Sequence, residues 1–135
     1  MSLNEVLGKK YKLEKSENFD EYLKASGLTI QLRKELFNAC PVMVLEKEGA
    51  QYVLSNTLFK NSVTKFTPGV EFDYTSLNGR PVKTTISING NTLHEVQKDA
   101  DGTKNCIDRT FKPNEVQVVT SVNGVNATRT YKLQA

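Results

Sequence analysis

The length, composition and charge of this chain are those of a small soluble globular protein. Its 135 residues, 24% charged and 38% hydrophobic, suffice for one domain over residues 1–135 with a core or a lined cavity. The formal net charge of +3 is mild and no long Lys/Arg run occurs, which argues against nucleic-acid binding, since that function draws on dense basic patches.

Targeting segments and metal-binding motifs are not evident in the sequence. The N-terminus MSLNEVLGKKYKL lacks the apolar stretch of a signal peptide, and no segment reaches membrane-spanning length, so we expect a cytoplasmic protein. Cys40 and Cys106 are the only cysteines and His94 is the only histidine, which is too sparse a set for a zinc site. We therefore expect two reduced thiols, no metal and no cofactor.

The N-terminal third of the chain predicts two short helices, over about residues 18–39. In NFDEYLKASG, Asn18 is a candidate N-cap and Gly27 a candidate C-terminal stop. In LTIQLRKELFNAC, Thr29 is a candidate N-cap and Pro41 ends the helix. The apolar side chains of each segment fall on one helical face: Phe19, Tyr22 and Leu23 in the first, and Leu28, Leu32 and Leu36 in the second.

From Val42 onward, short apolar runs alternate with tight turns. A Glu-Gly turn follows the first run, and the later turns carry strong hairpin signals. These are Asn78-Gly79, Asn89-Gly90, Asp101-Gly102 and Asn123-Gly124. Turns that recur roughly every eight to twelve residues predict an antiparallel meander that closes into a barrel or a sandwich.

The last strand, VNATRTYKL, directs an arginine toward the interior. Strand side chains alternate with period two, so Arg129 and Tyr131 share the more apolar face. In NCIDRTF, Arg109 likewise shares the face of Ile107. Two arginines converging in a packed core would repel each other and leave donors unpaired, whereas a hollow barrel with water and an anion removes both objections. The alternative is an arginine paired with an internal acid, for which strand parity makes Glu95 a candidate.

Three stretches, together with Arg109 and Arg129-x-Tyr131, carry a family resemblance over essentially the whole chain. KKYKLEKSENFDEYLKASG resembles the N-terminal signature of the intracellular lipid-binding proteins, the cytosolic fatty acid-binding family. TLFKN is similar to the portal loop of that family, and NGRPVKT to the turn and strand that follow. The two arginines, twenty residues apart, and the tyrosine match the three residues that hold the ligand carboxylate in many members. Three departures are Ser26, where the signature usually has an aliphatic or long basic residue, Asn78, where an acidic residue is frequent, and KDADGT, a turn one residue longer than usual.

The resemblance implies a mainly β fold, a ten-stranded antiparallel β-clam capped by a short helix-turn-helix. It implies a carrier that binds a long-chain fatty acid in an internal cavity and delivers it to membranes or proteins, and we expect a monomer. The carboxylate would be held by Arg109, Arg129 and Tyr131. The cavity and its portal would be lined by Phe19, Tyr22, Leu23, Phe59, Arg80, Gln97, Ile107, Val118 and Thr120. For Phe19, plain packing of a helix on the barrel is the alternative, and for Arg80 a solvated turn.

A basic rim near the helical cap would favour transient contact with anionic membrane surfaces. It consists of Lys24, Arg33, Lys34 and Lys60. The alternative for these residues is a merely solvated helix face.

Two other functions stay open at this point. A retinoid carrier is possible because retinoic acid also presents a carboxylate. A lipid-modifying enzyme is less favoured, since the chain has no Gly-x-Ser-x-Gly elbow and His94 is expected on the outward face of its strand. We therefore expect a protein that is not an enzyme.

Overall fold

The structure is a computed structural model that describes residues 3–56, 62–76 and 79–134. In this part of the chain it contains ten strands, two α-helices and one 3-10 helix. The helical elements are η1 (Leu3–Glu5), α1 (Phe19–Ala25) and α2 (Ile30–Asn38). The strands are β1 (Tyr11–Glu17), β2 (Val42–Glu48), β3 (Gln51–Asn56), β4 (Ser62–Phe66), β5 (Phe72–Thr75), β6 (Pro81–Asn89), β7 (Thr92–Lys98), β8 (Lys104–Phe111), β9 (Glu115–Val122) and β10 (Val125–Leu133).

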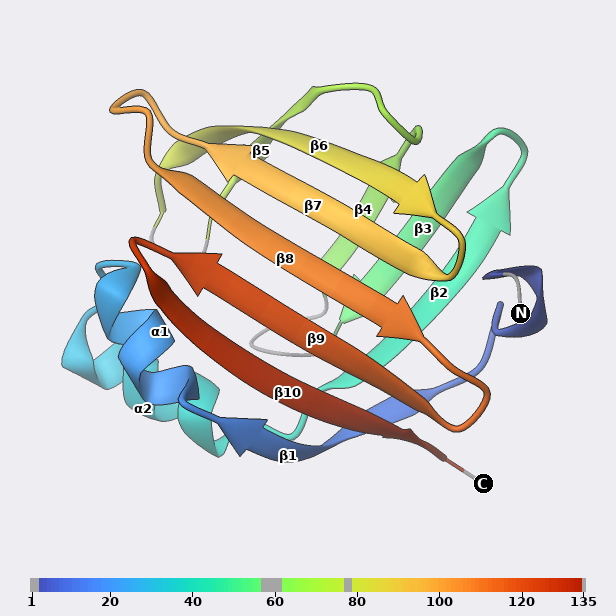
Figure 1. The fold of residues 1–135 in the computed structure, drawn as a ribbon, viewed down its shortest axis with the longest axis horizontal. Helices are drawn as coiled ribbons and strands as arrows, with labels where there is room; N and C mark the ends of the chain where they lie inside the picture. Colours follow the sequence, from blue (N-terminus) through green and yellow to red (C-terminus); the bar gives the residue numbers. More distant parts are fainter. Residues whose placement is uncertain (1–2, 57–61, 77–78, 135) are drawn as a thin grey trace.

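The strands form one antiparallel sheet that curls into a nearly closed barrel (Figure 1). Their order is β4-β3-β2-β1-β10-β9-β8-β7-β6-β5, so β1 joins β10 to β2, and β4 and β5 are the two edges. The helices α1 and α2 lie at one end of the barrel, where α1 packs on β9 and β10, and η1 lies at the other end. The expected ten-stranded β-clam with a two-helix cap is confirmed.

The ends of the two helices follow the sequence signals with one exception. Gly27 has a φ of +82°, and its N–H bonds to Lys24 O while the N–H of Leu28 bonds to Leu23 O, which is the Schellman arrangement expected of a glycine stop. Thr29 Oγ1 accepts a hydrogen bond from Leu32 N, as expected of an N-cap.

The prediction for Asn18 is correct in position, but the expected capping bond is not formed. Asn18 stands at the N-cap position of α1 with a φ of 60°, and its side chain makes no capping bond. Its Nδ2 instead donates to Asn126 O at 2.8 Å, which fastens the start of α1 to β10. Asparagine tolerates the left-handed region better than most residues, so the turn into the helix uses backbone conformation and a tertiary bond in place of a cap.

A register shift in β1 matters for the interior. Leu13 pairs with Tyr131, but Lys15 pairs with Thr130 and Ser16 with Arg129. Strand β1 therefore contains one extra residue, between Leu13 and Lys15, relative to β10. Such a bulge reverses the parity of the strand beyond it. Ser16 therefore lies opposite Arg129 across the β1–β10 pair.

The interior is layered along the barrel axis. At the η1 end, apolar side chains form a cluster that includes Val6, Tyr11, Met43, Leu45, Phe66, Leu93, Phe111, Val116 and Tyr131. Under the helices a second cluster is formed by Phe19, Tyr22, Leu23, Leu28, Leu36, Val122 and Ala127. The inward positions between them are polar on several strands: Thr84, Glu95, Thr120 and Arg129 are all buried. A polar layer between two apolar ones is where a buried polar group of a ligand would find partners.

Candidate functional site

Arg109 and Arg129 lie in one transverse row of the barrel wall. The register pairs Arg109 of β8 with Val118 of β9, and Val118 with Arg129 of β10. Because neighbouring strands are about 4.8 Å apart, the two arginine backbones are separated by roughly 10 Å. Two long cationic side chains therefore start from the same level of the interior. Strand parity predicted their inward face but not this common level.

Arg129 is almost fully buried, with 3% of its surface exposed. Its Nε donates to Ser16 Oγ at 3.0 Å, and its guanidinium carbon lies 3.7 Å from the centre of the Phe19 ring and 5.9 Å from that of Tyr131. Its Nη2 has no hydrogen-bond partner within the described residues. Burial lowers the pKa of Arg129, while electrostatic interactions with Tyr131 and Cys40 oppose the shift; the guanidinium stays charged at neutral pH.

A buried cation with an unsatisfied donor is costly unless an anion accepts from it. Phe19 covers one face of the Arg129 guanidinium, in the geometry of a cation–π contact. An approaching anion is thus left with the edge of the guanidinium, where Nη2 lies. This arrangement can bind a planar oxyanion through directed hydrogen bonds, with the Tyr131 ring beside it.

Arg109 has an internal partner. Its Nη1 donates to Glu95 Oε1 at 2.7 Å, and Gln97 Nε2 donates to Glu95 Oε2 at 2.6 Å. Glu95 pairs across β7 and β8 with Ile107, two residues before Arg109, and long side chains readily bridge such a diagonal. The proposed acid partner of an inward arginine is therefore real, and it belongs to Arg109. The Arg109 Nε is buried without a partner in the described part of the chain.

The helices α1 and α2 form the lid of the barrel, and α1 supplies the lid side chains that border the site. Phe19 and Tyr22 stack with ring centres 6.0 Å apart, and Leu23 is fully buried beneath the helices. The Tyr22 hydroxyl donates to Asn105 Oδ1 at 2.7 Å, which ties α1 to β8. Burial raises the pKa of Tyr22, and its hydrogen bonds to Asn105 and Ser26 partly oppose the shift. Phe19 thus both packs in the lid cluster and contacts the buried arginine.

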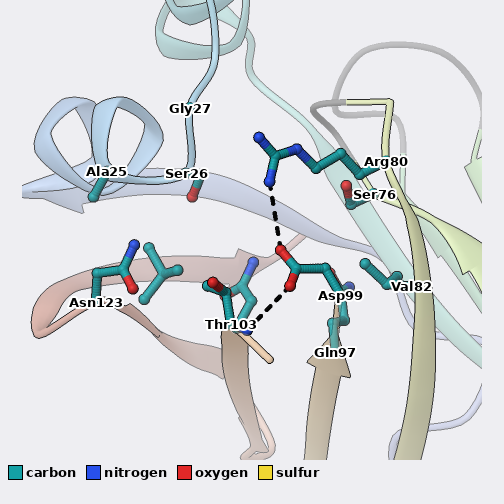
Figure 2. A pocket seen from close by; sticks show the side chains of 12 residues that line it. Ala25, Ser26, Gly27, Ser76, Arg80, Val82, Gln97, Asp99, Thr103 and Asn123 are labelled. Carbon is teal, nitrogen blue, oxygen red and sulfur yellow. Dashed lines mark hydrogen bonds and ion pairs between the residues drawn. The ribbon is translucent and has the colours of Figure 1, made fainter. Parts of the chain in front are cut away.

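A pocket of about 210 Å³ opens at the same end of the barrel (Figure 2). Its walls come from the end of α1 and from three inter-strand turns, and include Ser26, Arg80, Gln97, Asp99, Asn105 and Asn123. Arg80 reaches across the opening, with Nη1 3.6 Å from Asp99 Oδ2 and 3.8 Å from Asp101 Oδ2. Gln97 lines this pocket, here called the mouth, and also bonds to Glu95, so it links the wall of the mouth to the Glu95–Arg109 pair.

The remaining predicted residues are distributed over the barrel wall and the lid. Val118 and Thr120 are buried, Ile107 is half-buried and cross-strand to Thr120, and Gln97 is 7% exposed. Arg80 is exposed at the mouth, and its acidic partners come from the long KDADGT turn. Phe59 and Lys60 lie outside the described residues. Arg33 is largely covered and lies 3.7 Å from Asp20, whereas Lys24 and Lys34 are exposed.

Sequence reasoning missed Ser16 as a partner of Arg129 and Asn105 as a partner of Tyr22. Asn105 carries a usable signal, because it shares the inward face of Ile107 and Arg109. Ser16 carries none in the period-two pattern, since the bulge changes its parity. His94 is half-exposed and contacts Asp108 on the outer face of β7 and β8, as expected of a strand-surface residue.

A family model described as the lipocalin / cytosolic fatty-acid binding protein family matches residues 7–134. The chain belongs to this family. It is 37% identical over 127 residues to the sodium/calcium exchanger regulatory protein 1 of Doryteuthis pealeii, covering 93% of this chain and 95% of that protein. The crystal structure of a fatty acid-binding protein in brain tissue of Drosophila melanogaster is 41% identical, with a TM-score of 0.89 and coverage of 94% of this chain and 98% of that one.

A Schistosoma mansoni fatty acid-binding protein in complex with arachidonic acid is similar over the full length of both chains. It is 28% identical to this chain, covers 100% of each and has a TM-score of 0.91. The family resemblance inferred from the motifs is confirmed by these matches.

Neither helix of the described residues is long and apolar enough to cross a membrane. Over the same ranges, no three His, Cys, Asp or Glu side chains gather closely enough to hold a metal ion. Both cysteines are free thiols, Cys40 at the surface and Cys106 partly covered.

Proposed function

We propose that this protein is a cytosolic carrier of a long-chain fatty acid, whose carboxylate is bound inside the barrel by Arg129 and Tyr131 with help from Arg109. The observation that carries the proposal is the Arg129 guanidinium, 3% exposed, with Nη2 unpartnered among the described residues. Family membership and similarity to a protein that was crystallised with arachidonic acid support a lipid ligand. No chemical step is needed for this function.

The physics of such binding divides between the head and the tail of the ligand. A carboxylate presents two oxygens that match the donors of a guanidinium, and charge-assisted bonds of this kind are stronger than neutral ones. The tail is stabilised by removal of its methylenes from water, at about 0.8 kcal/mol for each. The apolar positions proposed for the tail are Ile107 and Val118 in the wall and Phe19, Tyr22 and Leu23 under the lid.

The two alternatives differ from this proposal in ligand shape and in chemistry. A retinoid carrier would use the same head-group residues but would need a cavity suited to a rigid polyene. A lipid-modifying enzyme would need a nucleophile or a general base, and the sole histidine, His94, lies on the outer face of the barrel. The matching family is described by fatty-acid binding, which supports a carrier over an enzyme.

Mass spectrometry of lipid extracted from the purified protein tests the proposal directly. Long-chain fatty acids in about equimolar amount are expected, and delipidated protein should rebind them in competition with a fluorescent fatty acid. Recovery of a retinoid, with weak fatty-acid binding, would favour the first alternative. Turnover of acyl esters that follows protein purity would favour the second.

We further propose that the helical lid contacts anionic membranes during delivery. Ile30 and Phe37 on α2 are 63% and 58% exposed, and exposed Lys34 lies between them in the helix. Apolar side chains flanked by lysines suit the boundary between head groups and acyl chains. Lys24 on α1 is a second exposed cation at the helix-capped end of the barrel.

Transfer of a fluorescent fatty acid to vesicles tests this second proposal. Neutralising Lys24 and Lys34 should slow transfer to anionic vesicles, leave transfer to neutral ones nearly unchanged, and lose its effect in high salt. Phe37→Ser should slow transfer to both, whereas Val119→Ser, at another exposed apolar residue on β9, is the matched control. Equal rates for all variants would reduce these residues to a solvated helix face.

A further inference from the structure

Three charged side chains face the polar layer of the interior in the described part of the barrel: Glu95, Arg109 and Arg129. The three side chains differ in the partners that they have. Arg109 and Glu95 form a close pair whose side chains are 13% and 7% exposed. Among the described residues Arg129 has no acidic partner: the Ser16 hydroxyl and two aromatic rings lie beside it, and Cys40 is close enough to interact electrostatically. The charges of the pair cancel, which leaves one positive charge for a ligand.

Both carboxylate oxygens of Glu95 accept hydrogen bonds from neighbouring side chains. Oε1 accepts from Arg109 at 2.7 Å and Oε2 accepts from Gln97 at 2.6 Å. Gln97 lies two residues further along the same strand and lines the mouth pocket. A carboxylate with a donor on each oxygen is positioned to keep neutralising Arg109 when a ligand binds.

We propose that Glu95 determines the charge of the head group that this interior accepts, restricting it to a single negative charge. This inference rests on the proposed function of the site and names its specificity-determining residue. Glu95 need not touch the ligand; it acts by cancelling Arg109. A monoanion then makes the interior neutral, whereas a dianion such as a phosphate monoester leaves one buried negative charge uncompensated, which is unfavourable in a weakly polar medium.

The test compares two ligands that share an alkyl chain and a tetrahedral head. An alkyl sulfate carries one negative charge, and an alkyl phosphate carries nearly two at about pH 8, since its second pKa is near 6. Wild type should bind the sulfate more tightly. In Glu95→Gln the phosphate-to-sulfate ratio of affinities should rise by about tenfold or more, because one interior charge at a distance of several ångströms has been removed.

Glu115→Gln is the matched control. It removes the same charge from the outer face of β9, where Glu115 pairs with Lys132 at 3.0 Å, and should leave the ratio unchanged. An unchanged ratio in Glu95→Gln, or an equal rise in Glu115→Gln, would overturn the inference.

A charge-restoring double variant gives a second test that uses a fatty acid alone. Arg109→Gln leaves the charge of Glu95 without a counterion in the polar layer that also holds Arg129, and should weaken fatty-acid binding by about tenfold or more. Adding Glu95→Gln restores one net positive charge and should recover most of that loss. If the double variant binds as weakly as Arg109→Gln, Glu95 does not set the interior charge and the inference fails. A wild-type protein that binds neither fatty acids nor alkyl sulfates would instead refute the proposed function.

Discussion

Replacing Arg129 by glutamine removes an interior charge that lacks an acidic counterion among the described residues. Glutamine keeps a donor of similar reach, so the change isolates the charge from the hydrogen bonding. Loss of one partner of a buried charged interaction costs several kcal/mol in a dry interior, and the polar layer around Arg129 should reduce this to about 1–3 kcal/mol. Affinity for a fatty acid should therefore fall by roughly 5- to 150-fold.

The assay is displacement of a fluorescent probe by three ligands of equal chain length: an acid, an alcohol and a methyl ester. Arg129→Gln should weaken binding of the acid and leave the two neutral ligands within about twofold, since they gain little from the charge. Lys132→Gln is the control, three residues further along β10 and on its outer face. Its surface pair with Glu115 contributes little to stability, so neither ligand affinity nor unfolding should change much.

Thermal unfolding separates a binding role of Arg129 from a structural one. Without ligand, Arg129→Gln should be at least as stable as wild type, because a buried cation with an unsatisfied donor has been removed. The gain in melting temperature on adding fatty acid should shrink in proportion to the lost affinity. Equal weakening of acid and alcohol, or a large loss of stability without ligand, would refute the reasoning and assign Arg129 to barrel architecture.

Two further predictions concern the lid. Tyr22→Phe removes the hydrogen bond to Asn105, so it should cost about 0.5–1.5 kcal/mol of unfolding free energy and speed ligand release. Because burial raises the pKa of Tyr22, the wild-type protein should lose stability as the pH rises above 10.0, and Tyr22→Phe should lose less. Gly27→Ala places a side chain at a φ of +82° and should cost about 1–2 kcal/mol by denaturant unfolding, against no loss in Lys24→Ala; an unaltered Gly27→Ala would mean that the α1–α2 turn is not strained.

Strand parity was sufficient to place the principal side chains of the interior. Arg129 and Tyr131 follow from period two on β10, and the same rule puts Arg109 and Glu95 on the inward face of the neighbouring strands β8 and β7. The rule works because each of these strands is regular and has one buried face. It also predicts that Glu95 is within reach of an inward arginine, although parity alone does not say which one.

Other features depend on interactions that a local pattern does not contain. Ser16 reaches Arg129 only because a bulge reverses the parity of β1, and Asn18 bonds to Asn126 on a strand more than a hundred residues away instead of capping α1. The mouth pocket is assembled from the end of one helix and several turns, so it exists only after the barrel has closed. The contacts of Arg80 with Asp99 and Asp101, in the turn between β7 and β8, likewise form only once the barrel has closed.

The central claim is that a ligand carboxylate lies beside Arg129 inside the barrel, and carbon NMR of a carboxyl-labelled fatty acid tests it most directly. A buried guanidinium favours the charged form of a neighbouring carboxyl, so the pKa of the bound fatty acid should lie below that of an exposed carboxyl and rise in Arg129→Gln. Lys132→Gln should leave it unchanged. A bound carboxyl that titrates like an exposed one, with the same midpoint in Arg129→Gln, would contradict the account.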